Sequence, residues 1–134
     1  MTRLLIATLA LGAMLVGCAS SGTSLTGNTW EWTASTTKTP ASQSVVPKPQ
    51  NYTIEFKTNQ TFAAKADCNQ VSGTWTSTSG NGLNITLGPS TLAACGPDSL
   101  ADAYLAGLAK ASLYVLEESK LILKLSDEGT MTFQ

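Results

Sequence analysis

Two cysteines, Cys68 and Cys95, enclose the stretch that most restricts how this chain can fold. Between them, residues 71–76 and 83–87 alternate apolar or small side chains with polar ones, which is the pattern of half-buried β-strands. Residues 79–82, Ser-Gly-Asn-Gly, are a strong turn signal. The stretch therefore predicts a β-hairpin at the centre of the fold, with a cysteine close to each of its ends.

The N-terminal residues predict an exported chain. Arg3 precedes an apolar run at residues 4–16, and these 13 residues are too few to cross a hydrocarbon core of about 30 Å. A run of this length fits the apolar part of a secretory signal. It ends in Leu-Val-Gly-Cys, which is similar to the lipobox of bacterial lipoproteins, where cleavage precedes the cysteine and lipid is attached to it. We therefore expect a lipoprotein signal peptide at 1–17, followed by a lipidated Cys18 and a flexible tether at 18–26.

Lipid on Cys18 would place the protein in the bacterial cell envelope, with the membrane as its first partner. No aspartate directly follows Cys18, so in a Gram-negative organism we expect the outer membrane, with the domain facing the periplasm. Disulfides form in exported proteins, and once Cys18 carries lipid, the remaining pair, Cys68 and Cys95, is predicted to form one. A second partner, an envelope protein, is expected, and the sequence leaves its identity open.

The rest of the chain predicts more strands and one helix. Residues 52–57 and 62–66 alternate cleanly and predict a second hairpin. An apolar stripe predicts a helix at about 98–111. Residues 35–50, with three prolines, predict a long loop or an edge segment, either variable in structure or a lip for binding. The fold class expected is α+β, mainly β: a small antiparallel β-barrel-like domain of about 7–8 strands with one helix packed on it. The other predicted strands are residues 29–33, 113–117, 121–125 and 130–134.

Three motifs resemble those of a known family. Residues 25–30 read Leu-Thr-Gly-Asn-Thr-Trp, residues 68–73 read Cys-Asn-Gln-Val-Ser-Gly, and residues 90–95 read Ser-Thr-Leu-Ala-Ala-Cys. In this order they resemble the META domain of HslJ-like heat-shock lipoproteins, and we expect that domain at 27–134. The resemblance implies a compact, barrel-like β domain with a helix, located in the cell envelope and linked to tolerance of stress and of some antibiotics. It implies no catalytic residue.

The composition argues against common classes of enzyme and of nucleic-acid-binding protein. The chain has no histidine, the commonest general base and metal ligand, and its 8 basic and 9 acidic residues leave no basic footprint. We therefore predict no catalytic residue, no metal site, no cofactor and no nucleic-acid partner. Asp98 and Asp102 could mimic paired catalytic carboxylates, but support of the helix dipole is the favoured interpretation. Trp30, Trp32 and Trp75 could line a ligand groove, but packing in the core is favoured.

A candidate contact surface lies beside the first cysteine. Asp67, Asn69 and Gln70 are polar and flank Cys68, so they are expected to form an exposed edge, although a turn held by side-chain hydrogen bonds explains them as well. The leading hypothesis is a non-enzymatic, lipid-anchored envelope protein that supports envelope integrity or tolerance of stress and antibiotics. The alternatives are a periplasmic protein inhibitor, similar to lysozyme inhibitors, and a small-ligand binding module, which requires an open cavity.

Overall fold

The computed structural model describes residues 23–134 of the chain. The predicted signal peptide and the predicted lipid site at Cys18 lie outside the described residues. Within them, Leu25 is buried, and Thr26 forms a parallel bridge with Phe56. The last residues of the predicted tether therefore belong to the folded domain.

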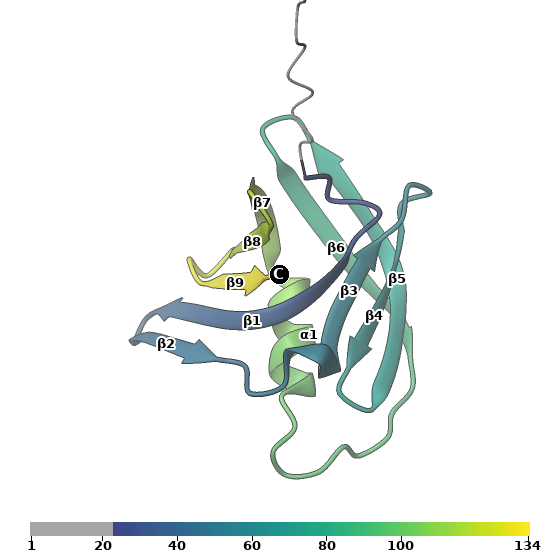
Figure 1. Ribbon diagram of the computed structural model, residues 1–134, viewed down its shortest axis with the longest axis vertical. Coiled ribbons are helices and arrows are strands. Elements are labelled where there is room, and N and C mark those ends of the chain that lie inside the picture. The colour runs from purple at the N-terminus through teal and green to yellow at the C-terminus, as the bar shows by residue number, and fades with distance from the viewer. Residues whose placement is uncertain (1–22) are drawn as a thin grey trace, which may run out of the picture.

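Within residues 23–134, nine antiparallel strands form one sheet in the order β2-β1-β3-β4-β5-β6-β7-β8-β9. Strand β1 also pairs with β9, which closes eight of the strands into a ring and leaves β2 attached to β1 alone. Figure 1 shows the strands curving around helix α1. The elements are β1 (Thr29–Lys38), β2 (Ala41–Val45), the 3-10 helix η1 (Pro49–Asn51), β3 (Tyr52–Phe56), β4 (Thr61–Ala66), β5 (Asn69–Thr78), β6 (Gly82–Ser90), α1 (Ala101–Ala109), β7 (Ala111–Glu117), β8 (Lys120–Leu125) and β9 (Thr130–Phe133).

Alternation in the sequence explains most of these strands. In β3, Tyr52, Ile54 and Phe56 are buried, whereas Thr53 and Glu55 between them are not. Because successive side chains of a strand point to opposite faces, this pattern fixes which face of the sheet packs inward. The two predicted hairpins, β3–β4 and β5–β6, are confirmed, and the three predicted C-terminal strands pair as a meander, β7–β8–β9.

The ring is barrel-like without being a regular barrel. Its weakest junction is between β6 and β7, which pair only at Gly82 and Leu113, next to a hydrogen bond from Tyr114 N to Asn81 O of 3.0 Å. The remaining neighbours share between three and seven residue pairs, with β-bulges in three of the ladders. The predicted fold class, an antiparallel barrel-like sheet with one helix, is confirmed for the described part of the chain.

Helix α1 is shorter than the predicted 98–111. It spans Ala101–Ala109, so Asp98 lies before it and is not on the same helix as Asp102. Leu100, which precedes the helix, has φ −98° and ψ +14°, and its N–H donates to Tyr52 Oη at 2.8 Å. Gly96, with a φ of +101°, turns the chain before this point, so the helix starts only after the contact with β3.

The interior of the barrel is filled with side chains. Tyr104 and Leu108 from α1 are 0% exposed and pack against the sheet, where the ring of Tyr104 lies 5.4 Å from that of Trp32 and 6.4 Å from that of Phe133. Trp30 is also buried, and its Nε1 donates to Leu25 O at 3.0 Å. This filled core argues against a ligand cavity inside the barrel, although an open groove lies at its rim.

The prediction for residues 35–50 needs correction. They form the second half of β1, a tight turn, β2 and η1, so the interpretation as a long loop is wrong and the alternative, an edge segment, is correct. Prolines do not prevent pairing here because Pro40 lies in the turn and Pro47 and Pro49 follow β2. The β1–β2 hairpin therefore extends the sheet beyond β3.

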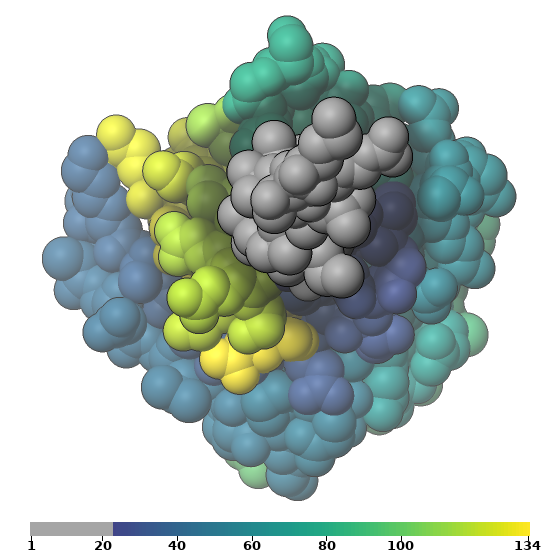
Figure 2. All heavy atoms as spheres, turned by 45° about the horizontal axis from the view of Figure 1, so that its top comes forward, coloured from purple at the N-terminus to yellow at the C-terminus, as the bar shows by residue number. Residues whose placement is uncertain are grey.

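The domain has two distinct ends. Figure 1 shows the first described residues at the top, and β2, η1 and the start of α1 in the lower half. At the upper end, the Thr23 hydroxyl donates to Glu118 O in the β7–β8 turn. Figure 2, in which this end comes forward, shows the same turn and the residues that follow Thr23 on one face. Thr23, the first described residue, therefore lies at the end of the domain away from β2.

Candidate functional site

The predicted disulfide between Cys68 and Cys95 is confirmed, with Cα atoms 5.5 Å apart. Cys68 lies in the turn between β4 and β5, and Cys95 lies in the segment between β6 and α1. The bond therefore holds residues 91–100, which contain no helix or strand, against the β4–β5 turn.

The side-chain amide of Asn69 also holds residues 91–100, through hydrogen bonds. Its Nδ2 donates to Ala93 O at 3.0 Å, and its Oδ1 accepts hydrogen bonds from Ala93 N at 2.8 Å and from Thr91 Oγ1 at 3.0 Å. Only 9% of the residue is exposed. Asn69 is therefore not part of an exposed contact edge, because its amide is occupied by the backbone that it positions.

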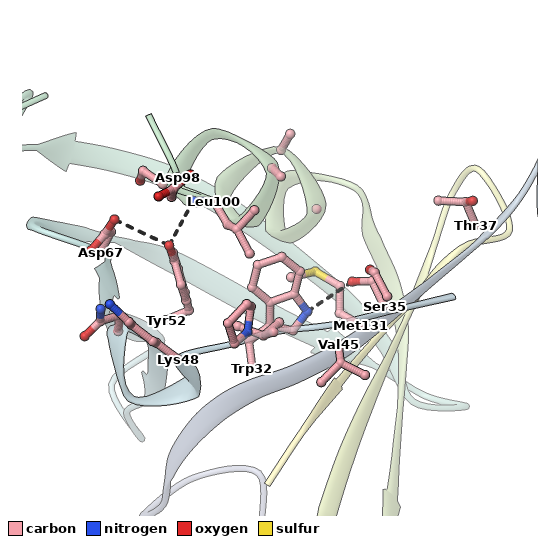
Figure 3. Close-up of a pocket in the computed structure, with 18 of the residues that line it drawn as sticks. Trp32, Ser35, Thr37, Val45, Lys48, Tyr52, Asp67, Asp98, Leu100 and Met131 are labelled. Carbon is pink, nitrogen blue, oxygen red and sulfur yellow. Dashed lines mark hydrogen bonds between the residues drawn. The ribbon is translucent and has the colours of Figure 1, made fainter. Parts of the chain in front are cut away.

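The other two residues of the predicted contact surface are separated. Gln70 is exposed on β5, whereas Asp67 is half-buried, in the β4–β5 turn. The Asp67 carboxylate accepts a hydrogen bond of 3.4 Å from Tyr52 Oη, which itself accepts the bond from Leu100 N (Figure 3). The structure thus brings Asp67 into a groove beside α1 and leaves Gln70 outside it.

This groove, of about 1120 Å³, opens between α1 and the β1–β2 hairpin. On one side, α1 presents Ala103, Ala106 and Gly107, and on the other lie β2 and η1. Small side chains on this face of the helix leave the space open, while the opposite face carries Tyr104 into the core. Gly107 also permits close approach to the sheet, because a Cβ there would lie 2.5 Å from Met131 Sδ.

The floor of the groove is apolar with a few hydroxyl groups. Trp32 and Met131 are buried beneath it, and the indole Nε1 of Trp32 donates to Ala34 O at 3.0 Å and to Ser35 Oγ at 3.1 Å. Figure 3 shows Trp32 and Val45 in the middle of the groove. Trp32 therefore satisfies both interpretations drawn from the sequence, since it packs in the core and lines a groove.

Charged side chains occupy the two ends of the groove. Lys110 pairs with Asp127 at 2.9 Å, and the hydrogen bond from Lys110, followed by one from Gly129 N–H, lowers the pKa of Asp127. At the other end lie Lys48, Asp67 and Asp98 (Figure 3). The lining thus combines apolar contact area with hydrogen-bonding groups at its edges, which is the usual composition of a binding site.

Several reactive or hydroxyl groups that line the groove are already engaged within the protein. Among the described lining residues, Cys95 is held in the disulfide, and the hydroxyls of Ser35 and Tyr52 already take part in hydrogen bonds to protein groups. Residues 23–134 contain no cluster of three or more side chains of the kind that ligate a metal. Nor does any helix in this part of the chain have the length and apolar character needed to cross a membrane.

Sequence reasoning missed the groove because its walls come from segments far apart in the chain. The side of the groove formed by β2 and η1 lies almost wholly within residues 35–50, for which the sequence predicts a long loop or an edge segment. A local signal was present: Thr33, Thr36 and Thr37 are β-branched and favour continuation of β1. No local signal indicates that α1 would face this hairpin.

Comparison with known proteins places the chain among related folds. The model of the META domain family matches residues 23–134. The comparison with curated proteins finds no match. A DUF4847 family protein from Bacteroides vulgatus is similar in structure, with a TM-score of 0.65 at 15% identity, over 81% of this chain and 92% of that one. A protein from Burkholderia xenovorans, solved by NMR, has a TM-score of 0.65 at 22% identity, over 82% of each chain. At these identities the likeness shows a shared fold.

Proposed function

The chain belongs to the META domain family, and from this premise we propose that it is a non-enzymatic, lipid-anchored protein of the bacterial cell envelope that acts by binding a partner in its groove. The groove carries this proposal. It is large, its floor is apolar, and its edges offer hydrogen-bonding groups, as in sites that bind without covalent chemistry. The family resemblance adds support for a role in envelope integrity and in tolerance of stress or antibiotics.

The position of the groove fits an anchored protein. The folded domain starts near Leu25, a few residues after the proposed lipid on Cys18, at the end away from β2 (Figure 1). A lipid at this end leaves the groove facing the aqueous compartment. The Leu-Val-Gly-Cys sequence at 15–18 supports the anchor itself.

Two measurements test the proposal. When the full chain is expressed in a bacterium, the wild-type protein is expected to partition into detergent and the Cys18→Ser variant into the aqueous phase. Equal partitioning of the two would refute the anchor.

Binding is tested by cross-linking envelope proteins to the anchored chain. Ala106→Trp fills the groove from α1, whereas Ala109→Trp places the same ring on an exposed position of α1 that does not line it. A genuine groove partner is lost with Ala106→Trp and kept with Ala109→Trp. Partners that survive both substitutions equally would show that the groove is not the binding site.

A further inference from the structure

Strand β2 has a free edge. Within residues 23–134 it pairs with β1 and with no other strand, from Ala41 opposite Lys38 to Val45 opposite Ala34. On the far side of β1 the corresponding edge is taken by β9. An edge strand of this kind carries a row of backbone N–H and C=O groups that a further strand can pair with.

The register shows which backbone groups face outward. Val46 N donates to Thr33 O at 2.9 Å, so the backbone of Val46 faces β1. In an antiparallel ladder the direction alternates along the strand, so Ser44 also faces β1, whereas Ala41, Gln43 and Val45 direct their N–H and C=O groups away from it. Three residues of β2 therefore offer hydrogen-bonding groups that β1 does not use.

The free edge borders the groove. Ser44, Val45 and Val46 all line it, together with Asp67 in the turn where β4 ends. Strand β4 pairs with β3 as far as Ala66 opposite Tyr52 and has no continuation beside β2. The groove thus occupies the place that one more strand would take beside β2, and its floor is apolar (Figure 3).

The usual protection of an edge strand is missing from β2. Natural edge strands discourage pairing with charged side chains, proline or bulges, yet Ala-Ser-Gln-Ser-Val contains no charge and no proline. All five residues are exposed, and Val45 is 79% exposed, one of the most exposed large apolar side chains among the described residues. An accessible, neutral edge with an apolar end is the arrangement by which sheets accept an added peptide strand.

The charges at the two ends of the groove indicate which charged side chain a bound peptide would carry. Lys48, Asp67 and Asp98 line one end of the groove, which gives that end an excess of one negative charge. The opposite end is neutral overall, because Lys110 and Asp127 pair with each other. A peptide with a basic side chain at the Asp67 and Asp98 end would complement this distribution.

We propose that the groove binds an extended segment of a partner protein, which adds to β2 as a further strand, places alternate apolar side chains on the groove floor, and directs a basic side chain to Asp67 and Asp98. This deepens the proposed function, because it names the chemistry of the partner. Main-chain hydrogen bonds to Gln43 and Val45 provide the affinity, and the groove and its acidic end provide the specificity.

The test uses the full-length protein in detergent and a labelled peptide of about six residues. The peptide alternates valine and threonine after an initial lysine, and binding is measured by fluorescence anisotropy. Gln43→Pro removes an outward N–H without touching a bond to β1, and Gln43→Thr is its control. Ala106→Trp fills the groove, and Ala109→Trp is its control. Two altered peptides, one methylated on the backbone nitrogens and one with glutamate for lysine, probe the same contacts without changing the protein.

The wild-type protein is expected to bind the peptide. Gln43→Pro, Ala106→Trp and backbone methylation are each expected to weaken binding about tenfold. Gln43→Pro and methylation remove backbone hydrogen bonds, whereas Ala106→Trp removes the space that the peptide would occupy. The controls should bind as the wild type does, and the glutamate peptide should bind several-fold more weakly at low salt. If Gln43→Pro does not fold, Ala106→Trp and the methylated peptide still decide the question.

Three results would overturn the inference: no peptide binding, binding that the groove variants and the methylated peptide leave unchanged, or a dimer in sedimentation that Gln43→Pro abolishes. The last would assign the edge to a second copy of the chain. Partitioning into detergent is measured on the same samples, so a lost anchor, which defeats the proposed function, is distinguished from a lost peptide site.

Discussion

The hydroxyl group of Tyr104 is expected to cost the protein stability. Tyr104 is 0% exposed, and no protein group within residues 23–134 forms a hydrogen bond with its Oη. Burial of a hydroxyl without a partner costs about 1–3 kcal/mol on a protein scale. Tyr104→Phe removes the hydroxyl and keeps the ring against Trp32 and Phe133. We therefore expect the free energy of unfolding to rise by about 1 kcal/mol, and the melting temperature by about 4 °C.

Tyr52→Phe is the matched control, with the opposite sign. Tyr52 is also buried, at 4% exposure, but its hydroxyl accepts the Leu100 N–H and donates to Asp67. Its removal leaves the Leu100 N–H without this partner, so the free energy of unfolding should fall by about 1–3 kcal/mol. Urea denaturation of both variants measures the two changes under the same conditions.

The dependence of stability on alkaline pH gives a second test of Tyr104. Burial raises the pKa of Tyr104 well above its ordinary value of 10.0. Above that pH the unfolded chain releases the phenolic proton while the folded chain retains it, so stability falls as pH rises from 10 towards the raised pKa. Tyr104→Phe should make this fall less steep.

A Tyr104→Phe variant that is less stable than the wild type by more than about 0.5 kcal/mol would refute the reasoning, because it would mean that the Tyr104 hydroxyl has a hydrogen-bond partner in the folded protein.

Further substitutions test how the wall and one end of the groove are held. Replacing Cys68 and Cys95 together with serine should lower the free energy of unfolding by about 3–4 kcal/mol in urea, and no loss would show that the disulfide adds little to stability. Asn69→Ala should cost about 1–3 kcal/mol, because it removes three hydrogen bonds that the buried Asn69 side chain forms with Thr91 and Ala93, and Asn69→Asp should not restore the lost donor. Hydrogen bonds to the Asp127 carboxylate lower its pKa from the ordinary value of 3.8. At a pH above 3.8 this charged carboxylate contributes to stability, and the contribution is lost as the pH falls through the lowered pKa. Asp127→Asn should therefore flatten the acid side of the stability curve, and Lys110→Ala should do the same.

Local patterns in the sequence predicted the parts of the fold that local physics determines. Alternation such as Tyr52, Ile54 and Phe56 specifies which face of a strand is buried, so both central hairpins were predicted. The pairing of Cys68 with Cys95 followed from the small number of cysteines in an exported chain. These features need no knowledge of contacts between distant segments.

Other features depend on long-range contacts and were missed. Strand β2 is exposed throughout and has no alternating apolar pattern, and it forms because β1 offers an edge to pair with. Asn69 has the polarity of a surface residue, yet it is buried because it pairs with backbone groups 24 positions away. Helix α1 starts at Ala101 rather than at about 98, directly after Leu100, whose N–H is bound by the hydroxyl of Tyr52 in the distant strand β3.

The stretch from Cys68 to Cys95 connects the stability of the fold to the shape of the groove. The contacts that hold residues 91–100 include the disulfide, the side chain of Asn69, and the hydrogen bond from Leu100 N to Tyr52 Oη. The end of this segment, from Cys95 to Leu100, lines the groove. Loss of any one contact should therefore loosen that wall as well as lower stability. Peptide binding to β2 should weaken in the disulfide and Asn69 variants and remain unchanged in Tyr104→Phe, which alters the core without touching the wall.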